Sequence, residues 1–285
     1  MKEKLIKLKK YGISSDTLKI IAIIIMIIDH VAYYFYNIIP DWAFYIMRYG
    51  FGRIGMPIFL YFIVQGFFNT KNFKKYVLRI AIFGVVTQLL ITLGWFINKY
   101  IFADYIINIY TFGNILISFS LTLILLKVIH EPMLLKKYNK KQNMLFKIVF
   151  VILLLSIYVF VPLDYGIAVP LLAILLYAIE RFRITVLISK SNTNTTFKGI
   201  LYKSVDDVTI KNIYSGLIFF AILICVLYGE LYWTSLFAII PLYLYNGERK
   251  KKYNKFKYAY YVFFPVHHFV LYMIAMVIDR LVNIT

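Results

Sequence analysis

The stretch TLKIIAIIIMIIDH, residues 17–30, decides the class of this protein. Eight successive apolar residues, 21–28, end at Asp29 and His30, and the apolar sequence then resumes. Such a run predicts a membrane-spanning helix with an ionisable pair near its middle. Ionisable groups are unfavourable in lipid, so the pair indicates a functional site. Lys19 precedes His30 by close to three full turns, which places both side chains on one helix face about 16 Å apart.

The composition supports a membrane protein. Hydrophobic residues make up 62% of the 285-residue chain, and the mean hydropathy of +0.76 is far above that of a soluble domain. The chain has 32 Lys and Arg residues against 13 Asp and Glu residues, for a net charge of +19. In a soluble protein this excess would suggest nucleic acid, whereas in a membrane protein basic residues gather in cytoplasmic loops. We therefore expect the lipid bilayer, and not nucleic acid, as a partner.

The apolar runs predict about nine membrane spans, each close to the length of about 20 residues that a bilayer requires. They fall at roughly 18–38, 46–69, 76–97, 105–128, 147–163, 166–182, 213–229, 231–246 and 258–278. All but four of the 32 Lys and Arg residues lie in the segments on one side of this arrangement. By the positive-inside rule that side is cytoplasmic. The sequence thus predicts an all-α integral membrane protein, a bundle with its N-terminus inside and its C-terminus outside, in which one short span could be re-entrant.

The chain is expected to form one polytopic domain over residues 1–285, because no internal repeat and no separate soluble domain divides it. Its longest polar insert, about residues 187–212, predicts a mobile cytoplasmic loop. A solvated connector is the simpler interpretation of this loop, and a lid over a substrate is the alternative.

Four polar residues from four different spans are expected near the same depth. A rise of 1.5 Å per residue from each predicted entry point places them near the middle of the bilayer. They are His30, Arg53, Asn114 and His267. Their convergence favours a single site.

Each of these residues also has a structural interpretation. His30 could serve helix packing, Arg53 could reach the outer interface, and Asn114 could bond neighbouring helices. Of the adjacent His267 and His268, one could simply face headgroups, and His267 is the one expected to point inward.

The sequence carries no metal or nucleotide motif. It has one cysteine and no His-x-x-x-His pair, and neither a Walker A pattern nor a dinucleotide glycine pattern occurs. Close helix packing explains Gly50, Gly52 and Gly55 better than phosphate binding does. We therefore expect no metal cofactor.

Several segments, taken in order, resemble the TraX family of polytopic membrane proteins. The first is the opening helix, 18–30, and the second comprises 52–59, 65–68, 70–72 and 74–79. Later segments are 164–166, 244–249 and 261–267. Together they extend over nearly the whole chain. Two positions depart from the family pattern, since His268 follows His267 in place of leucine, and Lys250 follows Arg249 in place of glycine.

The TraX family takes its name from a conjugation protein that acetylates the N-terminus of a pilin subunit. In layout it is similar to polytopic acyltransferases that use acyl-CoA and carry a basic residue and a histidine ten intervening positions apart in their first helix. Lys19 and His30 match that spacing. The resemblance implies a membrane acyltransferase of the bacterial cell membrane, with His30 catalytic and acetyl-CoA as donor. The acceptor would be an exported or membrane-embedded protein N-terminus or glycan.

In that reaction His30 would take the acceptor's proton, and Arg53 or Asn114 would stabilise the developing oxyanion. His267 is a further catalytic candidate. Asp29 lies about 100° round the helix from His30, so we expect it to bond another span and not to orient that imidazole.

The phosphates of CoA are expected at the cytoplasmic mouth of the bundle. Lys19 and the i,i+4 pair Lys75 and Arg79 suit phosphate recognition there. Asn246 and Arg249, in the family-like segment 244–249, are further candidates for donor binding.

The alternative is a non-enzymatic membrane protein, either a transporter or an assembly factor for conjugation or pili. A proton-coupled transporter also needs ionisable residues at mid-depth. It would more often show broken helices in paired halves, of which the sequence gives no sign.

Overall fold

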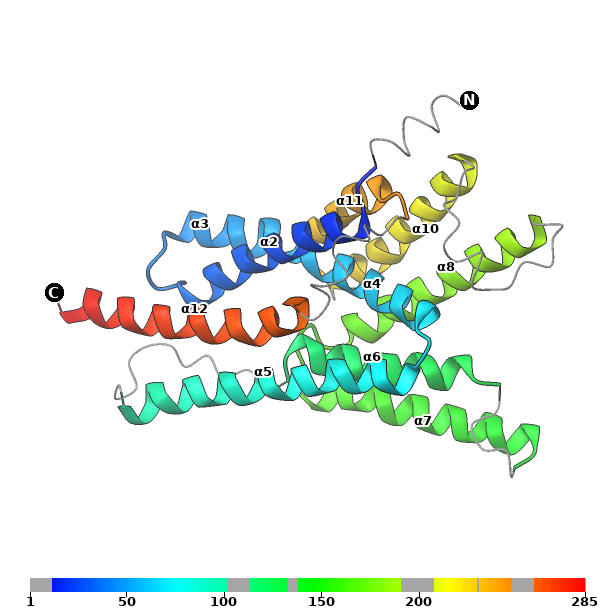
Figure 1. Ribbon diagram of the computed structural model, residues 1–285, viewed down its shortest axis with the longest axis horizontal. Coiled ribbons are helices and arrows are strands. Elements are labelled where there is room, and N and C mark those ends of the chain that lie inside the picture. Colours follow the sequence, from blue (N-terminus) through cyan, green and yellow to red (C-terminus); the bar gives the residue numbers. More distant parts are fainter. Residues whose placement is uncertain are drawn as a thin grey trace. The chain divides into compact units, whose positions relative to one another are not determined.

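Helices build nearly all of the structure, a computed structural model that describes residues 12–101, 113–132, 138–190, 208–229, 231–247 and 259–284. No strand occurs within these ranges, although Ile13 and Tyr245 form an isolated bridge. The helices are α2 (Ser15–Tyr34), α3 (Asp41–Tyr45), α4 (Gly55–Asn69), α5 (Phe73–Ile101), α6 (Ile115–His130), α7 (Lys140–Phe160), α8 (Ala168–Lys190), α10 (Val208–Leu227), α11 (Ile239–Leu244) and α12 (Ala259–Ile284) (Figure 1). Three shorter turns are the π-helical η1 (Ile46–Phe51) and the 3-10 helical η2 (Gly52–Ile54) and η3 (Trp233–Ala238).

Five helical segments among the described residues are long and apolar enough to cross a membrane. They are residues 15–34, 41–69, 73–100, 140–160 and 259–281, and three shorter apolar helices cover 115–130, 211–227 and 233–244. Each of the nine predicted spans overlaps a helix. The expectation of an all-α, multi-pass membrane protein is therefore confirmed, while the number of crossings and their sidedness stay predictions.

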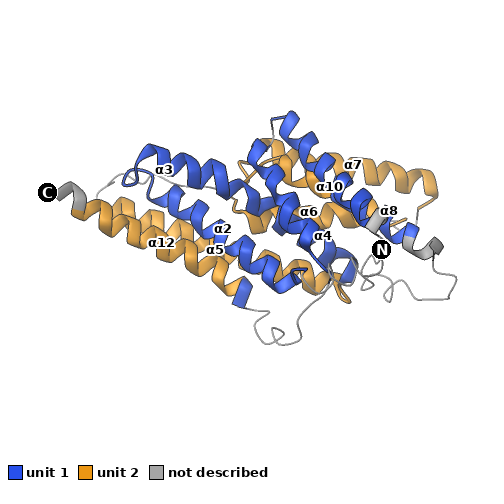
Figure 2. Ribbon diagram, turned by 90° about the horizontal axis from the view of Figure 1, so that it is seen from above, with its two compact units in different colours: residues 1–69, 175–260 blue, residues 70–174, 261–285 orange. Residues whose placement is uncertain are grey.

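By its internal contacts the chain divides into two compact units, each made of two segments that are far apart in the sequence (Figure 2). Unit 1 comprises residues 1–69 and 175–260, and unit 2 comprises residues 70–174 and 261–285. A single polytopic domain over residues 1–285 stays a prediction.

In unit 1, helix α2 buries one stripe of its surface. Ser14 caps its start, because the Ser14 side chain accepts a hydrogen bond from the Thr17 amide at 3.3 Å. The buried positions recur every three or four residues, the spacing of one helix face. They include Leu18, Ala22, Met26, Asp29 and Ala32. Asp29 therefore belongs to the buried stripe, with His30 beside it.

Helix α2 ends at Tyr34, before the expected end near residue 38. The chain turns there, because the carbonyl of Phe35 accepts hydrogen bonds from the amides of Ile38 and Ile39. Pro40 then precedes the next helix, a place where its missing N–H is harmless. The expectation that the Asp29–His30 pair lies near the middle of its helix is consequently wrong, since the pair lies near the C-terminal end.

In unit 2, helices α5 and α12 pack against each other and run in the same direction. Phe83 stacks on Tyr261 with ring centroids 5.5 Å apart, and Gly94 lies against the ring of Tyr272. Both pairs are offset by the same number of residues, so α5 and α12 run parallel, as Figures 1 and 2 also show.

Helix α6 runs antiparallel to both α5 and α7. Gly84 meets Ile117, and the Gln88 carboxamide oxygen accepts from the Gly113 amide at 3.0 Å. On its other side, the Tyr158 hydroxyl of α7 donates to the Ser118 carbonyl at 2.5 Å. These relative directions are the ones that the predicted order of spans requires within this unit.

Further element boundaries differ from the sequence prediction. Helix α6 begins at Ile115, not near residue 105, with Asn114 as its N-cap. The predicted loop 187–212 is shorter, because α8 continues to Lys190 and α10 begins at Val208. The rest of that loop, residues 191–207, lies outside the described residues.

Candidate functional site

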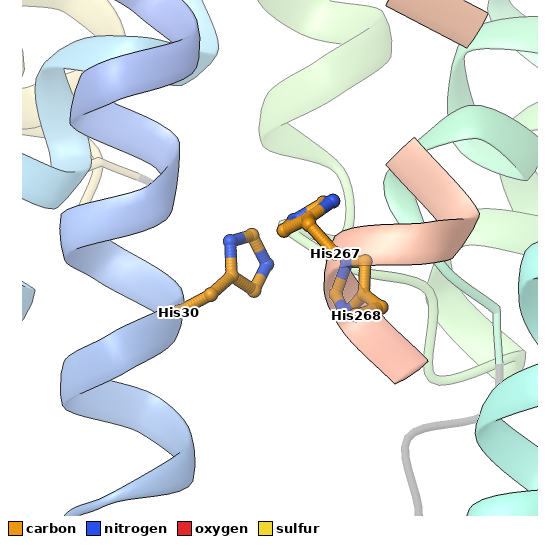
Figure 3. Close-up of side chains that lie close together, drawn as sticks. All are labelled: His30, His267 and His268. Atoms are coloured by element: carbon orange, nitrogen blue, oxygen red, sulfur yellow. The ribbon is translucent and has the colours of Figure 1, made fainter. Parts of the chain in front are cut away.

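The candidate site of unit 1 begins at His30, near the C-terminal end of α2 (Figure 3). Its Nδ1 atom lies 2.7 Å from the carbonyl oxygen of Met26, one turn earlier. A carbonyl oxygen only accepts hydrogen bonds, so Nδ1 must carry a proton. In a neutral imidazole Nε2 is then the proton acceptor. The backbone of α2 thereby sets the tautomer that a general base needs.

Asp29, the residue before His30, forms an ion pair with Arg48 of η1. The two side chains are 7% and 17% exposed, so the pair is largely removed from water. The Arg48 guanidinium also lies 4.7 Å from the ring centroid of Tyr33, one turn beyond Asp29. Asp29 thus bonds outside its own helix, as the sequence predicts.

A glycine allows α2 to approach the segment that carries Arg48. A Cβ atom placed on Gly52 would overlap the side chain of Asp29, and one placed on Gly55 would lie 3.3 Å from the Ile25 side chain. The expectation that close packing explains these two glycines is confirmed.

Arg53 lies on a different face of the same helical segment. Its guanidinium is 5.4 Å from the ring centroid of Tyr49 and 5.2 Å from that of Tyr232. The hydroxyls of Thr234 and Ser235 in η3 donate to the carbonyls of Tyr49 (2.5 Å) and Arg53 (3.1 Å). Aromatic rings and η3 therefore hold Arg53 in place.

The backbone that carries both arginines changes its winding between α3 and α4. Residues 46–51 form a π-helical turn and residues 52–54 a 3-10 turn. Single π-helical turns inside α-helices are frequent at functional sites. The winding changes where Arg48, Gly52 and Arg53 meet α2 and η3.

In unit 2, His267 repeats the hydrogen bonding of His30. Its Nδ1 lies 2.9 Å from the Phe263 carbonyl oxygen, so Nδ1 donates and Nε2 is the acceptor. The ring stacks on that of Phe263 at 4.9 Å and neighbours His268 at 4.5 Å (Figure 3). Both histidines are buried. Each therefore faces protein and not open solvent.

Asn114 caps the start of α6 and bonds Gly84 and Gln88 near the middle of α5, and its depth in the membrane stays a prediction. Its side-chain oxygen accepts from the Leu116 amide at 3.1 Å. Its amide group donates to the Gly84 carbonyl at 2.8 Å and to the Gln88 side chain at 3.4 Å. These two bonds use both hydrogens of the Asn114 side-chain amide. They match the structural interpretation, in which Asn114 bonds neighbouring helices.

The cations expected at the donor phosphates belong to different units. In unit 1, Lys19 lies 5.2 Å from the ring centroid of Phe62 and 5.9 Å from that of Tyr260. In unit 2, Lys75 is exposed, and Arg79 lies 5.7 Å from the Tyr261 ring.

The remaining donor-binding candidates lie in the segment after α11. The Asn246 side chain donates to the Gly12 carbonyl at 3.3 Å, and the Asn246 backbone amide donates to the Ile13 carbonyl. Asn246 thus ties this segment to the start of α2. Arg249 lies outside the described residues.

Sequence reasoning missed two features of unit 1. It counted Arg48 only among the four basic residues on the outer side of the predicted bundle, because nothing in the sequence links that residue to Asp29. It also passed over Glu180, which accepts hydrogen bonds from Arg183 Nε at 3.0 and 3.1 Å and from the Tyr214 hydroxyl at 2.6 Å. The signal for this buried network is an acid and an arginine three residues apart at the end of an apolar run.

The fold and these contacts define a class, a multi-pass all-α membrane protein with a polar cluster buried beside a histidine. Comparison with known proteins narrows the class. The chain belongs to the TraX protein family, whose pattern matches residues 14–275. No solved structure matches the chain.

Two curated relatives are similar to parts of the chain. One, from Dichelobacter nodosus, is named "Probable fimbrial assembly protein FimC, serogroup H1" and is 34% identical over 115 residues, 40% of this chain and 46% of the relative. The other is an uncharacterised protein of Rickettsia prowazekii (strain Madrid E), 35% identical over 95 residues, 33% of each chain. The matched regions thus span less than half of either relative.

Proposed function

We propose that this chain acts in the assembly of pili, as a multi-pass protein of a bacterial cell membrane. The observation that carries the proposal is the similarity to the relative named as a fimbrial assembly protein, together with membership of the TraX family. The five long apolar helices suit a protein that meets pilus subunits in the membrane.

Deletion of the gene from its host tests this role. Electron microscopy of the deletion strain should show few or no surface pili, and the wild-type gene should restore them. Normal pili on the deletion strain would contradict the proposal.

Within this role we propose that the chain transfers an acyl group, in the simplest case acetyl from acetyl-CoA, to the pilus subunit or another exported acceptor. The observation that favours chemistry is the hydrogen bond from His30 Nδ1 to Met26, which leaves Nε2 as a proton acceptor.

In the proposed reaction His30 alone serves as general base and then as general acid. Nε2 takes a proton from the acceptor's amine or hydroxyl as that atom attacks the thioester carbonyl. The carbon–sulfur bond then breaks, and the thiolate of CoA takes the proton from His30. Arg53, held between Tyr49 and Tyr232, is the proposed partner of the developing oxyanion. His267, with the same Nδ1 bond to its own helix, is the second candidate base.

Lys19 is the proposed ligand of the donor's phosphates, and Lys75, Arg79, Asn246 and Arg249 are further candidates. Lys and Arg both bind phosphate through charge-assisted hydrogen bonds. Lys19 has the strongest case, because it shares a face of α2 with His30.

Binding of the donor separates an enzyme from a non-enzymatic assembly factor or a transporter. A ligand that binds only the folded state raises the Tm by mass action. Acetyl-CoA and CoA should therefore raise the Tm of the purified protein, and adenosine without phosphates should not. No rise with either CoA compound would leave the assembly role standing without acyl transfer.

A further inference from the structure

The helical segment from Arg48 to Arg53 presents two faces to two different neighbours within unit 1. Arg48 and Gly52, four residues apart, meet α2. Tyr49 and Arg53, also four residues apart, receive hydrogen bonds from η3 at their carbonyls. Residues four apart in a helix share a face. The segment is therefore fixed on the η3 side and contacts α2 with the other side.

Arg48 contacts α2 at two points that lie one turn apart. Its guanidinium pairs with Asp29 and lies over the ring of Tyr33. These two residues precede and follow His30 in the sequence. Gly52 lets the backbone of the segment come close beside Asp29. Arg48 thus links the last turns of α2 to a segment that η3 holds.

His30 lies in the part of α2 where such a link has the largest effect. The helix ends four residues later, at Tyr34, and helix ends open more readily than helix centres. The hydrogen bond from His30 to Met26 fixes the ring to α2, but it does not fix α2 to the rest of the unit.

We propose that Arg48 is a positioning residue for His30, acting through Asp29 and Tyr33. The proposal rests on the proposed function in that it takes His30 as the general base. An ion pair suits this task better than an apolar contact, because its directional bonds select one geometry. Loss of either partner leaves the other charged group buried and uncompensated, so the helix end shifts or opens.

The test measures the reactivity of His30 directly in the full-length protein in detergent. Diethyl pyrocarbonate acylates unprotonated imidazole, and peptide mass spectrometry gives the rate for each histidine. Exposed His130, on α6, is the internal reference. We expect Arg48→Gln and Asp29→Asn to raise the rate at His30 about tenfold or more, with His130 unchanged, since breaking a buried pair exceeds the free energy of a tenfold change.

Two further variants separate positioning from general instability. Arg48→Lys keeps the charge and should return the His30 rate most of the way to the wild-type value. Arg183→Gln breaks a second buried ion pair of unit 1, with Glu180, and should leave the His30 rate unchanged. An unchanged His30 rate in Arg48→Gln overturns the proposal, as does an equal increase in Arg183→Gln.

Acyl transfer supplies a second readout. Arg48→Gln should lower kcat and leave the KM for acetyl-CoA unchanged, because the variant disturbs the base and not the donor site. If the wild-type protein transfers no acyl group, the proposed function fails, and the modification rates at His30 still decide whether Arg48 positions it.

Discussion

At the scale of single residues, the proposed chemistry depends on which nitrogen of an imidazole carries the proton. The carbonyl of Met26 settles this for His30, and the carbonyl of Phe263 does the same for His267. In both cases the partner lies one turn earlier in the same helix. Two histidines in different units thus share one local geometry that suits proton transfer.

Lys19 carries a prediction about binding. Lys19→Gln should raise the KM for acetyl-CoA roughly tenfold with little change in kcat, because a charge-assisted contact is worth roughly 1.5–3 kcal/mol. Enzyme kinetics with the purified protein measure both constants.

Lys99→Gln is the matched control, since Lys99 also lies over aromatic rings, those of Trp95 and Tyr100. It loses a similar cation–π contact and should leave the KM unchanged. Correct insertion and unchanged CoA affinity in Lys19→Gln would instead identify Lys19 as a membrane anchor.

The residues of the site differ in how far the sequence could predict them. Asp29 and His30 stand out because they interrupt an apolar run. The angle of about 100° between adjacent helix residues also predicted that Asp29 bonds outside its own helix. That angle did not predict the partner, since Arg48 is nineteen positions away and pairs with Asp29 only through tertiary packing. The N-cap position of Asn114 was not predicted, because the apolar count assumed an unbroken helix from residue 105.

At the scale of elements, two asparagine caps offer a direct comparison of local and interhelical bonding. Asn114→Ala removes the N-cap of α6 and two bonds to α5, so it should destabilise the protein by about 2 kcal/mol or more. Asn139→Ala removes the N-cap of α7, whose capping box is exposed, and should cost about 1 kcal/mol. Thermal unfolding in detergent measures the difference, and equal losses would show that the bonds to α5 contribute little.

Two glycines test the close approach of α2 to the π-helical segment. Gly52→Ala places a methyl group against Asp29 and should cost about 1–3 kcal/mol. Gly216→Ala, in α10, meets no neighbouring atom and should be neutral or stabilise by up to about 1 kcal/mol, because alanine is the better helix former. Midpoints of thermal unfolding compare the two, and a neutral Gly52→Ala would contradict the observed packing.

Helices were predictable from the sequence as elements, but not all of their ends were. Long apolar runs gave each helix its approximate place, because burial in lipid or protein requires them. The end of α2 and the start of α6 depended on turn and cap signals, such as Pro40 and Asn114, that an apolar count ignores. The π-helical turn at 46–51 lies where the chain contacts α2 and η3, and we find no signal for it in the local sequence.

At the scale of the whole molecule, the distribution of basic residues predicts the orientation in the membrane. A cysteine introduced at Lys251 should resist an impermeant thiol reagent in intact cells, and one introduced at Thr285 should react. The native Cys225 is buried, so background labelling should be low. Labelling at Lys251 would overturn the nine-span arrangement.

The central claim, acyl transfer by His30 in pilus assembly, is tested most directly by intact-mass spectrometry of pilus subunits. Three strains are compared: the deletion strain alone, the deletion strain with the wild-type gene, and the deletion strain with the His30→Ala gene. The wild-type and His30→Ala proteins must insert into the membrane equally well. The account predicts subunits heavier by one acyl group with the wild-type gene alone, since loss of a general base slows transfer roughly 10²–10⁴-fold. Acylated subunits in the His30→Ala strain, or identical masses in all three strains, would contradict it.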